Sequence, residues 1–200
     1  MAARPKHGGR PGGRGVSSAR KPSATRMRVL ALRNRQRLRR VDLRLLRQIT
    51  RALLREAWPD ASVDLAIHVV GAPEITRLNE MFLRHEGSTD VITFDYAERA
   101  GQASRLSISR SAARGDEDRR DACPTLLHGE IFVCMDEALS QGRRFHAPWQ
   151  SELVRYVVHG VLHLLGYDDQ QPRARRKMKR AEDALVRKLA RQFEFRRLAC

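Results

Sequence analysis

The chain has 200 residues, of which 42% are hydrophobic and 31% charged, so it is long enough for one hydrophobic core and has the composition of a globular protein. It contains neither the run of about 18 apolar residues that a membrane-spanning helix needs nor the apolar segment of a signal peptide. The three cysteines are an odd number at unrelated spacings, which argues against a disulfide framework. The expected compartment is therefore cytoplasmic, with an organelle matrix as the alternative.

The formal net charge of +16 is concentrated at the N-terminus. Residues 1–40 hold 13 of the 39 Lys and Arg residues and no acidic residue, whereas the charges of the remaining chain nearly balance. A basic arm of this kind favours polyanions, above all nucleic acid, because the bound cations release counterions from phosphate. The alternative is a solvated run of charge without a partner.

We expect two parts, a disordered basic tail at residues 1–26 and one domain at residues 27–200. The tail is rich in Gly, Pro, Arg and Ser and has almost nothing to bury. It also resembles an organellar transit peptide, although its Gly and Pro content argues against an amphipathic helix, and Met27 is an alternative start. Within the domain, residues 99–125 are polar and without period, which predicts a flexible insertion.

The spacing of apolar residues predicts about four strands and about five helices. Alternating or β-branched runs predict strands, and apolar residues three and four apart, bounded by Pro or Gly, predict helices. In chain order, the expected elements are a strand at 27–34, a helix at 41–58, a strand at 62–70, a helix that begins at 73 and is closed by the glycine at 87, strands at 90–96 and 129–135, and helices at 136–145, 149–165 and after 172. Because strands and helices do not alternate regularly, the predicted fold class is α+β, a small mixed sheet packed with helices.

The segment HGVLHLLGYDD, residues 159–169, carries the most informative pattern. Residues four apart lie on one face of a helix, so His159 and His163 can direct two imidazoles at one metal ion. Valine and leucine surround them, and buried imidazoles need hydrogen-bond partners or a metal. A glycine break followed by acidic residues offers a third ligand and leaves one position open, as in catalytic zinc sites. The alternative interpretation is a pair of satisfied core histidines.

This segment resembles the H-G-x-L-H-L-x-G-Y-D-H signature of the YbeY family, bacterial metal-dependent endoribonucleases of rRNA maturation. Residues 78–94, LNEMFLRHEGSTDVITF, are similar to the family's L-N-x-x-Y/F and T-D/N-V-L/I-S/T-F segment, and GEI at 129–131 is similar to its G-D-I. Met178 and Glu182 fall in the helix that follows the signature. The resemblance spans about residues 28–190.

The resemblance implies one Zn²⁺ ion on a central helix, held by His159 and His163, with the family's third histidine replaced by Asp169. A carboxylate oxygen is a legitimate zinc ligand, and two histidines with one carboxylate form a known catalytic set. Such a site has one unit less positive charge than a site of three histidines, which favours harder ions. The alternative is a damaged site in which Asp169 is not a ligand. Asp168 aligns with the family's non-ligand aspartate.

Gly160 stands directly after the first histidine, where a metalloprotease carries its glutamate base. Phosphodiester cleavage asks for less, because a metal lowers the pKa of water and RNA carries its own 2′-hydroxyl. A cation near the metal would stabilise the charge that develops on phosphate. The family's arginine aligns with Leu83, so we expect Arg84, one residue later, to be the catalytic arginine or else a surface residue.

The predicted function is a zinc-dependent endoribonuclease specific for single strands. The resemblance implies a role in maturation of the 16S rRNA 3′ end and in ribosome quality control, with single-stranded rRNA and the small ribosomal subunit as partners. One alternative is a metalloprotease-like hydrolase, against which Gly160 argues. The other is a non-catalytic ribosome-binding protein with a degraded metal site.

Overall fold

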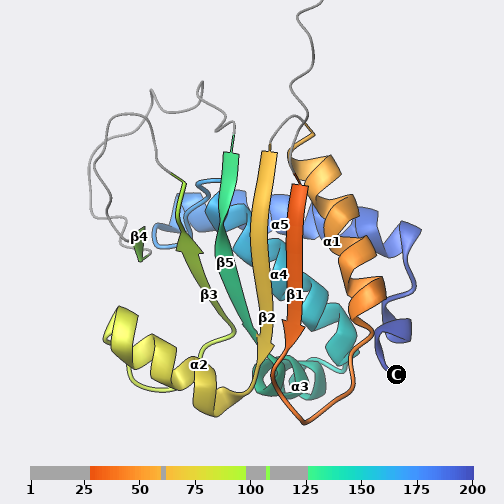
Figure 1. The fold of residues 1–200 in the computed structure, drawn as a ribbon, viewed down its shortest axis with the longest axis horizontal. Helices are drawn as coiled ribbons and strands as arrows, with labels where there is room; N and C mark the ends of the chain where they lie inside the picture. Colours follow the sequence, from red (N-terminus) through yellow and green to blue (C-terminus); the bar gives the residue numbers. More distant parts are fainter. Residues whose placement is uncertain (1–27, 60–61, 98–106, 109–125) are drawn as a thin grey trace, which may run out of the picture.

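A mixed β-sheet forms the centre of the molecule, with its strands in the order β1-β2-β5-β3-β4 (Figure 1). The structure is a computed structural model, and it describes residues 28–59, 62–97, 107–108 and 126–200. The predicted tail at 1–26 and most of the predicted insertion at 99–125 lie outside these residues. The α+β class is confirmed, because parallel and antiparallel strands share one sheet and the helices are not in regular alternation with them.

The three strands β1, β2 and β5 run parallel, and β3 pairs antiparallel with β5. All four predicted strands are confirmed to within a few residues. The short β4 pairs with β3 and was not predicted, since it lies within the expected insertion. The strands are β1 Arg28–Asn34, β2 Ser62–Val70, β3 Val91–Asp95, β4 Ser107–Ile108 and β5 Leu126–Cys134.

The five predicted helices are also confirmed, with differences of a few residues at their ends. They are α1 Leu43–Ala57, α2 Ala72–Leu78, α3 Met135–Arg144, α4 Trp149–Leu164 and α5 Pro172–Gln192, and a 3-10 turn, η2 Phe195–Leu198, ends the chain. The second helix continues without a break into one π-helical turn, η1 Asn79–Leu83. No helix of the described residues is both long enough and apolar enough to cross a bilayer.

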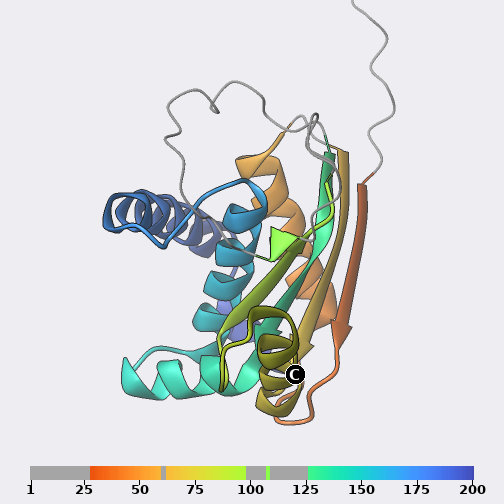
Figure 2. The ribbon, with the colours of Figure 1, turned by 90° about the vertical axis from the view of Figure 1, so that its left-hand side faces the viewer.

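Helix α4 lies between the sheet and α5 (Figure 2). It is in contact with β3 and β5 on one side and with α3, α5 and α1 on others, which explains why its sequence is apolar nearly all round. Its fully buried side chains are Leu153, Val154, Val157, Val158, Val161 and Leu162. The strip that remains partly exposed carries His159 and His163. One helix therefore provides both the middle layer of the core and the predicted ligands.

The close packing of α4 on the sheet depends on Gly160. A Cβ atom at this position would lie 2.6 Å from Cγ2 and 3.1 Å from Cδ1 of Ile131 on β5. Real side chains do not approach this closely, and Ile131 is fully buried on a central strand, so it has little room to move. The glycine thus faces the sheet, and the absence of a glutamate there has a packing cause.

Two carboxylates fix the starts of helices that border this core. Asp42 accepts hydrogen bonds from the backbone N–H groups of Arg44 and Leu45 at the start of α1. Asp136, near the N-terminal end of α3 as predicted, accepts from the backbone N–H of Ala72 at 2.7 Å. It therefore caps α2 and joins the two helices at the end of the sheet.

We expect Gly160→Ala to destabilise the fold. Overpacking costs about 1–3 kcal/mol and the better helix propensity of alanine returns about 1 kcal/mol, so the net loss of unfolding free energy is about 1–2 kcal/mol. Urea denaturation measures the loss. In an Ile131→Ala background the clashing atoms are gone, and the same substitution should then be neutral or stabilising. An equal cost in both backgrounds would contradict the packing argument.

Candidate metal centre

The three predicted ligands lie together in the structure. His159 and His163 project from one side of α4, and Asp169 approaches them from the loop between α4 and α5. One potential ligand atom of each residue lies within 4.8 Å of the other two. The two imidazole Nε2 atoms are 3.0 Å apart, and His159 Nε2 is 3.8 Å from Asp169 Oδ2. All three side chains are partly buried.

The turn after α4 brings Asp169 back to the histidines. Gly166 has a φ of +83°, its N–H donates to the carbonyl of His163 at 2.9 Å, and the N–H of Tyr167 donates to the carbonyl of Leu162 at 3.0 Å. These two bonds form a Schellman motif, which needs a left-handed residue directly after the helix. Since no atom lies within 4 Å of a Cβ at Gly166, its backbone conformation alone favours glycine there.

The hydrogen bonds of the two rings set their tautomers. His159 Nδ1 lies 3.0 Å from Glu182 Oε2, and His163 Nδ1 lies 3.1 Å from the carbonyl oxygen of Tyr167. Both acceptors are oxygens without a proton to give, so each Nδ1 carries the N–H and each Nε2 carries a lone pair. Two lone pairs that face each other at 3.0 Å require a cation between them.

A metal ion fits this donor set. Two nitrogens that bind zinc at about 2.0–2.1 Å with a tetrahedral angle are about 3.3 Å apart, close to the arrangement of the two rings. The Asp169 carboxylate supplies an anionic oxygen on the same side. The residues present can therefore hold a divalent ion, with room for a further ligand from the cavity described below.

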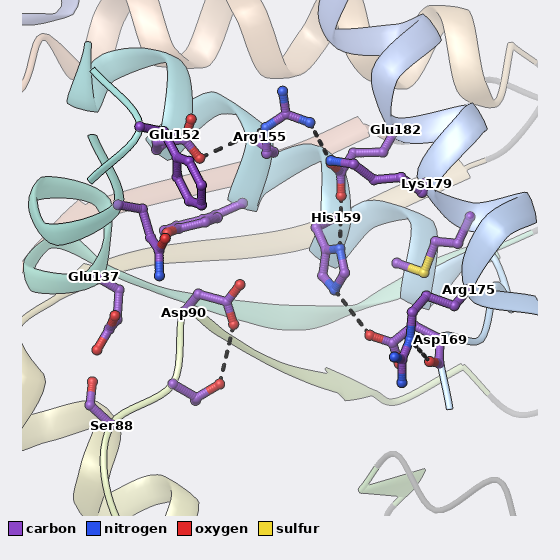
Figure 3. Close-up of a pocket in the computed structure, with 15 residues that line it drawn as sticks. Ser88, Asp90, Glu137, Glu152, Arg155, His159, Asp169, Arg175, Lys179 and Glu182 are labelled. Atoms are coloured by element: carbon purple, nitrogen blue, oxygen red, sulfur yellow. Dashed lines mark hydrogen bonds and ion pairs between the residues drawn. The ribbon is translucent and has the colours of Figure 1, made fainter. Parts of the chain in front are cut away.

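Glu182 on α5 anchors the first histidine (Figure 3). Its side chain is 5% exposed, and its Oε1 accepts from Arg155 Nη1 at 2.6 Å and from Lys179 Nζ at 2.8 Å. Burial alone would raise the pKa of Glu182, but the hydrogen bonds from His159, Lys179 and Arg155 lower it to about 2. The carboxylate is thus ionised, and it orients the His159 ring as carboxylates do beside metal-bound histidines.

The pKa values of the two histidines shift in opposite directions. Burial acts to lower the pKa of His159, but the hydrogen bond and the charge of Glu182 outweigh it, and the pKa is raised. Burial and the neighbouring His159 lower the pKa of His163. The pair therefore takes up a first proton at His159, and a metal ion competes with that proton for the same lone pairs.

A cavity of about 800 Å³ opens beside these residues, between α3, α4, α5 and the segment before β3 (Figure 3). Its charged lining includes the cations Arg155, Arg175 and Lys179. Arg155 and Lys179 are bound to Glu182 and Asp183. Arg175 donates through Nε to the backbone carbonyl of Asp169 at 2.7 Å, so it braces the ligand loop and lies in the cavity next to it.

The predicted catalytic residue Arg84 lies outside the lining of this cavity. It is exposed, has a φ of +56° and ends the π-helical turn η1. A π-helical turn accommodates one more residue than an α-helical turn, which matches the one-residue offset between Leu83 and Arg84 in the family alignment. The catalytic role of Arg84 stays a prediction, and the structure brings a different arginine, Arg175, next to the ligands.

The sequence interpretation missed the roles of Glu182 and of the three cavity cations. One signal for Glu182 was available. It shares the inward face of α5 with Met178 and Leu189, both fully buried, and a carboxylate on an apolar face needs a charged partner. Nothing in the sequence indicates that this partner includes a histidine 23 positions earlier.

Comparisons with known proteins agree with the site. Residues 31–190 match the model of the family described as endoribonuclease YbeY. An endoribonuclease YbeY of Chlorobium phaeovibrioides is 31% identical over 159 residues, which are 80% of this chain and 89% of that protein. The endoribonuclease YbeY of Salinibacter ruber is 36% identical over 109 residues, 54% of this chain and 59% of that protein.

A solved structure supports the fold. The solution structure of a Thermotoga maritima protein matches with a TM-score of 0.51 at 22% identity and covers 80% of this chain and 89% of its own. At this identity the likeness concerns the arrangement of the elements alone. With the family match over most of the domain and the histidine pair in place, the chain belongs to the endoribonuclease YbeY family.

Proposed function

We propose that the protein is a zinc-dependent endoribonuclease that cleaves single-stranded RNA. We infer further that it is cytoplasmic and acts in maturation of the 16S rRNA 3′ end and in ribosome quality control, with the small ribosomal subunit as its partner. The observation that carries the proposal is the pair of facing lone pairs on His159 and His163, with Asp169 beside them, at a cavity in a member of this family.

In the proposed mechanism, His159, His163 and Asp169 hold one Zn²⁺ ion. A bound divalent ion lowers the pKa of water and neutralises charge on a phosphate oxygen. Glu182 keeps the His159 ring oriented, and the Arg175 guanidinium, held beside Asp169, binds a phosphate oxygen of the substrate. Since Asp169 is an anion, the ligand set is one unit more negative than three histidines, and Mn²⁺ or Fe²⁺ competes better for it.

The packing of Gly160 favours a nuclease over a protease. Position 160 faces Ile131 on the sheet, so the glutamate base that metalloproteases carry there has no space in this fold. Peptide hydrolysis in such sites depends on that base, whereas phosphodiester cleavage proceeds with electrostatic stabilisation and a positioned nucleophile.

The exposed surface of α5 supports a polyanionic substrate. It carries nine basic side chains: Arg173, Arg175, Arg176, Lys177, Lys179, Arg180, Arg187, Lys188 and Arg191. The acidic residues of the helix, Glu182 and Asp183, are not free, because both are paired with Arg155 and Lys179. The basic surface begins at the cavity and continues for the length of the helix, about 30 Å, so it can bind successive phosphates of one strand.

Metal content tests the ligand set. The wild-type protein should retain about one zinc ion per chain after dialysis, measured by elemental analysis. Asp169→Ala should lose most of it, and Asp169→His should keep it. Asp168→Ala is the matched control, since the Asp168 carboxylate accepts the N–H of Gln170 and lies outside the donor group. Unchanged zinc in Asp169→Ala would remove Asp169 from the ligand set. Cleavage of single-stranded RNA by the wild type but not by His163→Ala tests the activity.

Glu182→Gln should weaken zinc binding about 10–100-fold, because the neutral amide stabilises the oriented ring less well. A competition titration against a chelating dye measures the affinity. Asp183→Asn is the control, because Asp183 binds the same Arg155 and Lys179 but not His159. If the two variants lose the same affinity, Glu182 acts only through the local charge.

Substitution of each arginine separates the two candidates for phosphate binding. Arg175→Ala should lower the rate of RNA cleavage about 100-fold with zinc content unchanged, the usual loss for one charge-stabilising donor. Arg84→Ala should have a smaller effect, since Arg84 is exposed and outside the cavity lining. Single-turnover cleavage assays at saturating enzyme compare the two. The reverse order of effects would restore Arg84 as the catalytic arginine.

A further inference from the structure

The cavity beside the metal centre has two chemically different sides (Figure 3). One side holds His159, Asp169 and Arg175, to which the proposed function assigns the metal and the phosphate. The other side, toward α3 and the segment before β3, holds the carboxylates of Asp90, Glu137 and Glu152. The proposed mechanism leaves this second side without a role.

Tyr156 on α4 lines the same cavity. The residue is 4% exposed, and its hydroxyl is buried without a hydrogen-bond partner among the described residues. Burial and then the charges of Asp90, Glu152 and Glu137 raise the pKa of Tyr156, so the hydroxyl is neutral and lies in the field of these carboxylates. A buried hydroxyl without a partner is costly to the fold and is rare unless a ligand supplies the partner.

The carboxylates on this side keep free acceptor capacity. Asp90 accepts through Oδ1 from the backbone of Val91 and from Thr89, which leaves Oδ2 with no described partner. The Glu137 side chain makes no hydrogen bond or ion pair with any described residue, whereas Glu152 is paired with Arg155 at 3.8 Å. The second side therefore presents acceptors that await donors.

These acceptors are too widely spaced for a directly bound metal ion. Among the residues that the structure describes, one group of potential metal ligands converges within 4.8 Å, and it is His159, His163 and Asp169. Acceptors spread over a wall suit an extended ligand with several N–H groups. Phe145, 64% exposed, belongs to the same lining and offers an aromatic face. N–H donors on a flat aromatic ring are the features of a nucleobase.

We propose that the side formed by Asp90, Glu137 and Tyr156 is a nucleobase subsite that selects guanine. The inference rests on the proposed function, in which the phosphate lies on the metal side. Guanine presents N1–H and its amino group side by side, which match the two oxygens of a carboxylate, and the unpartnered hydroxyl of Tyr156 completes the set. Uracil has one N–H between two carbonyl oxygens, and a carboxylate repels those oxygens. Stacking on Phe145 holds the base in the cavity.

Equilibrium binding tests the subsite without reference to cleavage. The probes are three fluorescently labelled oligouridylates that differ at one central nucleotide, which is guanosine, inosine or uridine, with zinc-loaded full-length protein in an anisotropy assay. The guanosine RNA should bind about tenfold more tightly than the uridine RNA, as expected for one paired contact to a base edge. Inosine keeps N1–H but lacks the amino group, so its affinity should lie between the two.

Variants connect the preference to the named residues. Glu137→Gln replaces one acceptor oxygen by a donor, and Tyr156→Phe removes the hydroxyl, so both should abolish most of the preference for guanosine. Tyr156→Phe should fold with at least wild-type stability, because the hydroxyl it removes has no described partner. Glu80→Gln is the control, since Glu80 is an exposed acid on η1 outside the cavity lining, and it should keep the preference.

Equal affinity for the three RNAs, no binding of any of them, or a guanosine preference that both variants retain would overturn the subsite. Mapping the cut sites in the same RNAs keeps the two proposals apart. Cleavage without regard to the base would leave the nuclease standing and reject the subsite. Guanosine-selective binding without cleavage would support the subsite and reject the nuclease.

Discussion

The structure of this site depends on one constraint, two imidazole lone pairs that face each other at 3.0 Å. The rings cannot turn away, because Glu182 and the carbonyl of Tyr167 occupy the other nitrogen of each. Glu182 in turn stays ionised in a buried position because Arg155 and Lys179 donate to it. A carboxylate buried alone would cost several kcal/mol, so the two cations are part of what makes the histidine geometry stable. The site is therefore built in layers around a position for a cation.

Helix α4 combines this site with the core by dividing its circumference. Gly160 and its buried neighbours Val157 and Val161 face the sheet, and the strip about a quarter-turn away carries His159 and His163. Each face restricts the other. The close approach to Ile131 brings the helix onto β5, and this same approach excludes the side chain on which a protease would depend. Packing and chemistry are thus coupled at a single residue.

Most of the fold and half of the site follow from local sequence. Strand and helix positions are set by apolar period, and the histidine pair with its glycine break is a local pattern, so both could be predicted. The bond between His159 and Glu182 joins residues 23 apart, and the cavity cations meet only because α5 crosses α4. Such contacts have no local signal. The misplaced arginine has a local cause, since the π-helical turn η1 shifts the chain by one residue in a way that an alignment of letters does not represent.

Charge gives the metal a second role besides its chemistry. The cavity lining holds five carboxylates, those of Asp90, Glu137, Glu152, Asp169 and Glu182, and three cations, those of Arg155, Arg175 and Lys179. Without a bound ion the lining is therefore net negative and repels phosphate, although the outer surface of α5 and the N-terminal segment attract it. A divalent ion brings the lining to neutrality. In a site with three neutral histidines the same lining would carry one negative charge fewer, so the carboxylate at position 169 makes phosphate entry depend more strongly on the metal being in place. The metal is then required before RNA can enter, because the long-range field brings the strand to the protein and the local field admits it only to the loaded site.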